Sequence, residues 1–103
     1  MNVGFIMYNW KDVSPKLDST LRLIHECVVR KYKVSIIYPS EMAIRRTTVC
    51  SYCHVIDYKE DYSSDMVEFY NQASLTKEFH PMKIHDVIFL RDNPPLDNHV
   101  LNF

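Results

Sequence analysis

The stretch from residue 2 to residue 38 reads NVGFIMYNWKDVSPKLDSTLRLIHECVVRKYKVSIIY. Its two ends, residues 2–8 and 33–38, are short apolar runs of the kind found in strands that are buried on both faces of a parallel sheet. Between them, an apolar stripe recurs at helical spacing, made by Leu17, Leu21, Ile24 and Val28. The order strand, helix, strand predicts a βαβ unit with a right-handed crossover.

The helix in this unit has two candidate starts. Ser14 precedes Pro15, and a serine cap followed by a proline at the first helical position is a common helix start. Asp18 opens the run Asp-Ser-Thr and offers a second start three residues before Leu21. The sequence alone leaves both starts open.

The rest of the chain is less regular. Residues 43–58 alternate and are rich in Thr, Val, Ile and Tyr, which favours one or two antiparallel strands at a sheet margin. Residues 59–80 are polar and irregular, with room for a helical turn around 64–72. Residues 84–91 form the clearest strand, and 96–103 open a further segment for which we expect a helix.

Composition excludes several classes of function. The 103 residues contain one glycine, Gly4, where an average domain has about seven, so no glycine-rich phosphate-binding loop can form. A net charge of −1 gives no long-range attraction to nucleic acid or anionic lipid. With no membrane-length apolar run and no signal-peptide pattern, we expect a cytoplasmic domain spanning residues 1–103. We expect Gly4 to permit close packing against the helix.

Cys50, Cys53 and His54 form a C-x-x-C-H pattern. It matches haem c attachment, a redox dithiol, or part of a zinc site completed by His80 or His85. Cysteines three apart on a strand point to opposite faces, and a redox pair usually opens a helix. We therefore expect ordinary strand cysteines, scattered histidines and no metal site.

The end of the clearest strand carries a candidate binding residue. Arg91 is followed by the stiff Pro94-Pro95 pair, and ligands of α/β sheets gather beyond the carboxyl ends of the strands. The planar guanidinium binds carboxylates or phosphates in a bidentate manner. From the residues alone, anion binding and a structural salt bridge both remain open for Arg91.

A resemblance to a known family narrows these alternatives. FLRDNPPLD at 89–97 resembles the MRKDPPFD stretch of bacterial-type glutathione synthetases, and IHDVI at 84–88 looks like the approach LADLDVIL. VGFIM at 3–7 is similar to the opening GIVMD. Asp18-Ser19-Thr20 lies where that family has K-D-S/T-S/T, and the segment from residue 26 to 34 follows EAQRRGYEL. The likeness covers nearly the whole chain in order.

The resemblance implies the N-terminal domain that precedes an ATP-grasp unit. In that family this is a small, Rossmann-like α/β domain, with a mainly parallel sheet and, here, a marginal antiparallel hairpin. The full enzyme uses Mg²⁺ and ATP to activate γ-glutamylcysteine as an acyl phosphate, which glycine attacks to give glutathione and ADP. The ATP-grasp part holds the nucleotide and metals, so we expect no cofactor on this chain. Its implied partners are an ATP-grasp domain, in the same or another chain, the peptide substrate, and a second copy of itself.

The resemblance also implies roles for individual residues. Arg91, Asp18 and Ser19 match positions beside the substrate, with Arg91 positioning a substrate carboxylate, and no catalytic residue is implied. Several positions depart from the family: Tyr8 replaces an Asp, Leu17 a Lys, and Asp92 and Asn93 a Lys and an Asp.

Lys31 replaces the glycine that follows the helix in that family. The helix must therefore end on a non-glycine residue in the left-handed conformation, or on a different cap.

The resemblance stops before the ATP-grasp part, so we expect the isolated chain to be inactive. It would be an excised domain of a longer ligase or a stand-alone relative. The alternative is a non-enzymatic interaction or dimerisation module, because a helix at the end of the chain would expose an apolar patch made by Leu96, Val100, Leu101 and Phe103.

Overall fold

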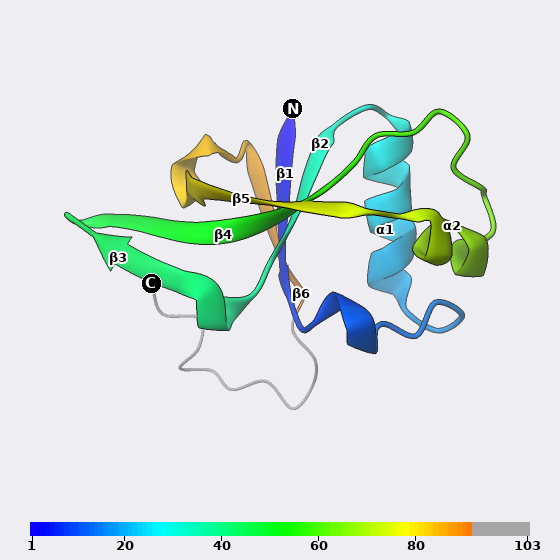
Figure 1. Ribbon diagram of the computed structural model, residues 1–103, viewed down its shortest axis with the longest axis horizontal. Helices are drawn as coiled ribbons and strands as arrows, with labels where there is room; N and C mark the ends of the chain where they lie inside the picture. Colours follow the sequence, from blue (N-terminus) through cyan, green and yellow to red (C-terminus); the bar gives the residue numbers. More distant parts are fainter. Residues whose placement is uncertain (92–103) are drawn as a thin grey trace.

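The computed structural model describes residues 1–91. Figure 1 shows two helices on one side of a sheet and a ribbon of strands that extends away from them. The elements are β1 (Asn2–Met7), η1 (Trp10–Asp12), α1 (Ser19–Val29), β2 (Lys33–Ile37), η2 (Pro39–Glu41), β3 (Met42–Arg45), β4 (Thr48–Ile56), α2 (Met66–Gln72), β5 (Leu75–Pro81), η3 (Met82–Ile84) and β6 (Val87–Arg91), where η marks a single 3₁₀ turn.

The sheet is mixed. Its six strands run in the order β3-β4-β2-β1-β6, with β5 paired to β4. Strand β1 pairs in parallel with β2 and β6, whereas β4 pairs antiparallel with β2, β3 and β5. The expectation of a mainly parallel, Rossmann-like sheet was therefore wrong, because three of the five pairings are antiparallel and only two α-helices are present in residues 1–91.

Strand β5 accounts for most of this difference. It occupies part of the segment 59–80 that looked irregular, and it pairs with β4 from Leu75↔Ile56 to Pro81↔Cys50. As an edge strand it carries exposed polar residues such as Thr76 and Lys77, so no buried face marks it in the sequence. The antiparallel strands expected over 43–58 are present as β3 and β4, but β4 lies inside the sheet rather than at its margin.

Helix α1 starts at the second of the two candidate positions. Asp18 is its N-cap, and the side chain accepts a hydrogen bond from the Thr20 backbone N–H at 2.8 Å. Leu21, Ile24 and Val28 are buried as expected. Leu17 precedes the helix and is 87% exposed, so its assignment to the apolar stripe was wrong.

The C-terminal end of α1 has a left-handed lysine. Lys31 has φ 66°, which is the first of the two expected alternatives. The Lys31 N–H donates to the Val28 carbonyl at 2.9 Å and the Tyr32 N–H to the Cys27 carbonyl at 3.1 Å. These two bonds form a Schellman motif with a side chain where glycine is usual.

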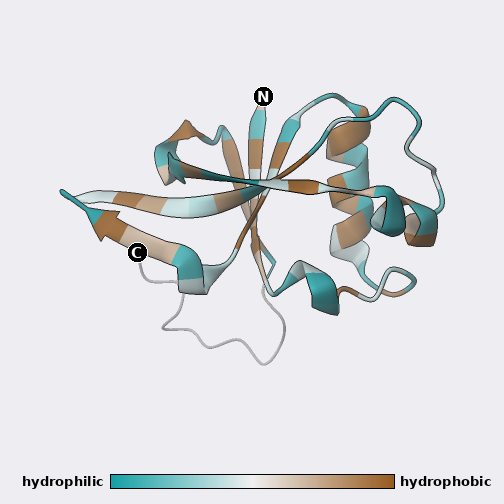
Figure 2. Cartoon of the chain, in the orientation of Figure 1, coloured by the Kyte–Doolittle hydropathy of each residue, from teal (hydrophilic) through white to brown (hydrophobic). Residues whose placement is uncertain are grey.

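The sheet is covered on both faces along β1 and β2. On the helix face, β1 contributes Val3, Phe5 and Met7 to a core that includes Ile24 of α1 and Phe69 of α2. Figure 2 shows hydrophobic and hydrophilic residues alternating along α1, as an amphipathic helix requires. No helix among the described residues is long and apolar enough to cross a membrane.

Gly4 faces the other side of the sheet. A Cβ at this position would lie 3.1 Å from Ile37 Cδ1 and 3.2 Å from His85 Cδ2. Ile6, Ile37, Cys53 and Met82 form a second core on this side. The glycine does permit close packing, but against Ile37 and His85 and not against the helix, so that part of the expectation was wrong.

Candidate functional site

The parallel strands β2, β1 and β6 end side by side, and we call the ends of these strands the carboxyl edge. Arg91 is the last residue of β6, is exposed, and pairs in register with Met7 at the end of β1. The first residues after β1 and β2 are Tyr8 and Tyr38. An exposed guanidinium at this edge can form bidentate hydrogen bonds with a carboxylate that approaches from solvent.

Asp18 and Ser19 lie at the same edge through a contact with Tyr8. The Tyr8 hydroxyl donates to Asp18 Oδ2, while Asp18 Oδ1 accepts from the Thr20 N–H. Both carboxylate oxygens are therefore engaged, and Asp18 holds the start of α1 against the end of β1. Ser19 is the first helical residue and is exposed, which leaves its hydroxyl open to solvent.

The structure thus brings the three expected residues to one edge, on the two sides of Met7 and Tyr8. Within residues 1–91, no hydrogen bond or salt bridge joins Arg91 to Asp18 or Ser19. Within this part of the chain, Arg91 therefore has no partner for the structural salt bridge that the sequence left open.

Three tyrosine hydroxyls fix the loop that joins β1 to α1. Tyr38 accepts a hydrogen bond from the Trp10 backbone N–H at 3.2 Å, and Tyr70 donates to the Trp10 carbonyl at 2.5 Å. With the bond from Tyr8 to Asp18, these contacts form what we call the tyrosine clamp, namely Tyr8, Tyr38 and Tyr70. Sequence reasoning missed the clamp because its partners lie 28 and 60 residues apart for Tyr38 and Tyr70.

Burial favours the protonated form of Tyr38 and of Tyr70. It raises the pKa of Tyr38, and it raises the pKa of Tyr70 together with the nearby charge of Asp12. Both phenols therefore remain neutral across the physiological pH range. Tyr70 needs this proton, because its hydroxyl is the donor in its hydrogen bond. Neutral Tyr38 and Tyr70 therefore hold the backbone of Trp10, in the loop at the carboxyl edge, by their hydrogen bonds.

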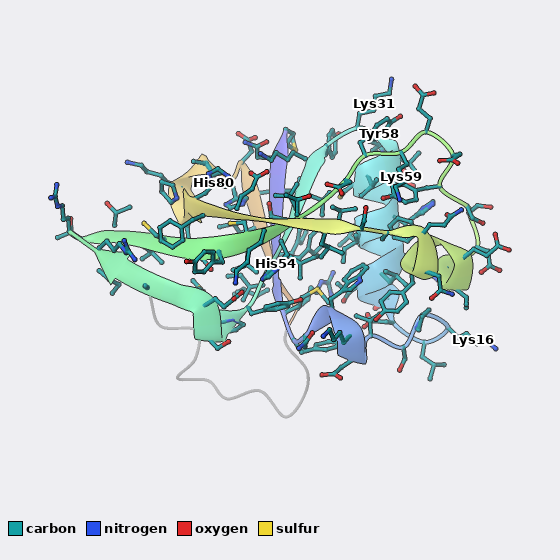
Figure 3. The ribbon with its side chains drawn as sticks, in the orientation of Figure 1. Lys16, Lys31, His54, Tyr58, Lys59 and His80 are labelled. Carbon is teal, nitrogen blue, oxygen red and sulfur yellow. The ribbon has the colours of Figure 1, made fainter. Side chains whose placement is uncertain are left out.

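His54 supports the clamp from the neighbouring strand (Figure 3). Its ring lies 4.6 Å from the ring of Tyr38, and its Nε2 is 2.7 Å from Glu41 Oε1. Lys77 Nζ lies 3.6 Å from the other oxygen of Glu41. His54 thus contacts the residues beside the carboxyl edge instead of forming a site with the preceding cysteines.

Cys50 and Cys53 do not combine with His54. Cys53 is fully buried in the second core, and burial raises the pKa of its thiol, which is the opposite of what activates a cysteine. His80 pairs with Glu78 at 2.7 Å, and His85 with the Met82 carbonyl at 2.9 Å.

Across residues 1–91, no three His, Cys, Asp or Glu side chains converge in a way that could hold a metal ion. Gly4, the one glycine, lies within β1 and not in a loop.

Two parts of the expected chemistry lie outside the described residues. They are the Pro94-Pro95 turn after Arg91 and the apolar residues Leu96, Val100, Leu101 and Phe103, on which the interaction-module alternative rests.

Comparison with known proteins agrees with the resemblance seen in the sequence. A search of curated proteins finds no significant match to this chain. The family described as "Prokaryotic glutathione synthetase, N-terminal domain" matches residues 1–103, which is the full length of the sequence. The chain therefore belongs to the family of prokaryotic glutathione synthetase N-terminal domains.

Proposed function

We propose that this chain is the substrate-side domain of an ATP-dependent ligase that joins γ-glutamylcysteine to glycine. The observation that carries the proposal is the gathering of Arg91, Asp18 and Ser19 at the carboxyl edge, around the end of β1. Ligands of sheets with parallel strands bind beyond these strand ends. Membership of the family indicates the reaction. The exposed Arg91 at the carboxyl edge provides a surface suited to an anionic peptide.

In this proposal, Arg91 positions one carboxylate of the peptide. An arginine fork that holds a carboxylate restricts the orientation of the substrate, and correct orientation is a large part of catalysis in ligation reactions. The exposed hydroxyl of Ser19 donates to a peptide oxygen. Asp18 acts indirectly, because its carboxylate already caps α1 and binds Tyr8.

The ATP-grasp part of the ligase, on the same or another chain, would hold Mg²⁺ and ATP. The isolated chain is accordingly expected to be inactive. The cytoplasmic location and the homo-oligomer expected from the sequence remain predictions.

The test joins residues 1–103 to the ATP-grasp portion of a prokaryotic glutathione synthetase and measures steady-state kinetics. Arg91→Ala should raise KM for γ-glutamylcysteine by about 10- to 100-fold, the effect of losing a charged hydrogen bond worth about 1.5–3 kcal/mol. The KM for ATP should stay unchanged, because that site lies on the other part. Arg91→Lys should recover part of the loss, since it keeps the charge but not the fork.

Arg30→Ala is the matched control. Arg30 is an exposed arginine at the C-terminal end of α1, on the edge opposite Arg91, and it pairs with Glu26 at 2.8 Å. Its removal should leave both KM values unchanged. Identical kinetics for the Arg91→Ala enzyme and the parent would refute the proposed role of Arg91.

A further inference from the structure

A pocket lies at the edge of the sheet opposite the carboxyl edge, where α1 turns into β2. It is open to solvent and has a volume of about 370 Å³, within the range of about 300–1,000 Å³ typical of small-molecule sites. Val55 and Ile56 at the end of β4 are buried and form its apolar floor. Tyr32 and Tyr58 line its sides, and Figure 3 shows Tyr58 and Lys31 beside this turn.

Lys31 lines this pocket and has a strained backbone conformation. Its φ of 66° lies in the left-handed region, where a residue with a Cβ pays a free-energy penalty that glycine avoids. Strained residues of this kind cluster at binding sites. Within residues 1–91, Lys31 forms no salt bridge, whereas its neighbours Arg30 and Lys33 pair with Glu26 and Glu78.

Asp57 contributes a carboxylate that is fixed in orientation. Its Oδ2 accepts from the Ser74 hydroxyl and its Oδ1 from the Thr76 hydroxyl, both at 2.9 Å. A carboxylate has about four acceptor positions, so each oxygen can take a further donor. Seven residues line the pocket: the apolar floor residues, the two tyrosines, Asp57, Lys31, and Lys33, whose ammonium pairs with Glu78 at 3.2 Å. Among them, Lys31 supplies the ammonium that forms no salt bridge within residues 1–91.

We propose that this pocket binds a free α-amino acid with an apolar or aromatic side chain. Lys31 pairs with the ligand carboxylate, and Asp57 accepts from the ligand ammonium. The side chain of the ligand covers Val55 and Ile56 and contacts Tyr58. A simple anion would be repelled by Asp57, and a simple cation would be repelled by Lys31. A zwitterion instead offers each of these two groups a partner of opposite charge.

This site is separate from the carboxyl edge and does not depend on the proposed ligase function. The two sites lie at opposite ends of β2, because Lys33 begins the strand beside the pocket and Ile37 ends it at the carboxyl edge. Binding at one site can be measured while the other is altered. Loss of Arg91 should leave the affinity of the pocket beside Lys31 for the amino acid unchanged.

The first test titrates the full chain with L-phenylalanine by calorimetry. Three analogues each lack one recognised feature: 3-phenylpropionate has no ammonium, phenethylamine has no carboxylate, and glycine has no apolar side chain. L-phenylalanine should bind saturably, and each analogue should bind at least about tenfold more weakly, a difference of about 1.4 kcal/mol. Equal affinity for 3-phenylpropionate, or no saturable binding of L-phenylalanine, would overturn the proposal.

The second test uses Lys31→Gly, which separates binding from folding. The substitution relieves the left-handed strain, so Tm should rise, by up to about 4–8 °C if about 1 kcal/mol is recovered. The same variant should bind L-phenylalanine about tenfold more weakly, because the carboxylate partner is gone. A stabilised variant with unchanged affinity would show that Lys31 is not part of a ligand site.

Lys59→Ala is the matched control for charge. Lys59 follows Tyr58 directly, but its Nζ donates to the Gln72 carbonyl at 2.8 Å and it does not line the pocket. Its removal should leave the affinity for L-phenylalanine within twofold of the parent. Asp57→Asn should weaken L-phenylalanine binding and leave 3-phenylpropionate binding unchanged or stronger, which identifies Asp57 as the ammonium partner.

Discussion

The parallel half of the sheet, β1, β2 and β6, and its antiparallel arm, β3, β4 and β5, are stabilised in different ways. In the parallel half, β1 and β2 are buried on both faces, by the helices on one side and by the second core on the other. In the arm, β3 is exposed from Ala43 to Arg45, and β5 is only partly covered. Figure 1 shows the far end of the arm pointing away from both helices.

Cross-strand side-chain pairs hold the arm where burial does not. The rings of Tyr52 and Phe79 meet edge to face at 5.0 Å. Lys77 lies 4.3 Å above the Tyr52 ring and Arg45 4.9 Å above the Phe79 ring. Such pairs contribute about 0.2–1 kcal/mol each, far less than a buried aromatic side chain. The comparison teaches that the same residue type should matter much more on the buried strands β1 and β2 than on the exposed strands β3 and β5 of the arm.

The largest effect should come from deleting one phenylalanine in each region. Phe5 is fully buried and stacks on Phe89 at 5.1 Å, whereas Phe79 is 38% exposed. Phe5→Ala should lower the free energy of unfolding by about 3–5 kcal/mol, and Phe79→Ala by about 1 kcal/mol. Urea denaturation followed by circular dichroism measures both. Equal losses would mean that the two regions are packed alike.

A smaller effect should come from adding a methyl group to the parallel half. Gly4→Ala brings a Cβ within 3.1 Å of Ile37 Cδ1, and Ile37 is fully buried. Overpacking typically costs about 1–3 kcal/mol, and the lower entropy of the unfolded chain returns about 0.4–1 kcal/mol. We expect a net loss of about 1 kcal/mol by urea denaturation.

Ile37→Val provides the background for this measurement, because it removes the Cδ1 atom that the new methyl group would meet. The double variant should be more stable than the sum of the two single changes predicts. Strict additivity would show that the second face of the parallel half is loosely packed at Gly4.

The smallest effect should be a pH dependence in the arm. Hydrogen bonds from His80 and from Lys33 lower the pKa of Glu78 below its ordinary value of 4.5. Because the folded-state pKa is the lower one, the stabilisation is present above about pH 4.5 and is lost as the pH falls through the folded-state pKa. As an exposed group, Glu78 should contribute less than about 1 kcal/mol.

The measurement compares the Tm of the parent with that of Glu78→Gln between acidic and neutral pH. The parent should be more stable near neutral pH, and the difference should vanish in acid. If the difference in Tm between the two proteins stays constant with pH, the effect comes from the shape of the Glu78 side chain and not from its charge.

The sequence predicted the elements whose signals are local. The βαβ unit, the Asp18 cap and the left-handed alternative for Lys31 depend on residues within a few positions of each other, and the structure contains all three. Leu17 was wrongly assigned to the apolar stripe because the apolar spacing continues on the N-terminal side of Asp18, the cap at which the helix begins.

Features that depend on distant partners could not be predicted. Strand β5 has no buried face of its own and exists because β4 supplies its hydrogen bonds. The partner of Gly4 was misassigned because His85 reaches it from the other end of the chain. At the candidate site, the family motif indicated Arg91, Asp18 and Ser19, but the contacts of Tyr38 and Tyr70 with Trp10 follow from tertiary packing alone.

The position of β1 also has a consequence for biosynthesis. This strand is the first to be made, yet it lies between β2 and β6, and the backbone N–H of Asn2 bonds to Asp86 Oδ2 across 84 positions. A nascent chain can pair β1 with β2 early, but the other side of β1 stays unpaired until residues 87–91 emerge from the ribosome. An apolar strand with an open edge is a template for pairing with other chains. The interval before β6 arrives is therefore the period in which this domain most needs protection from aggregation.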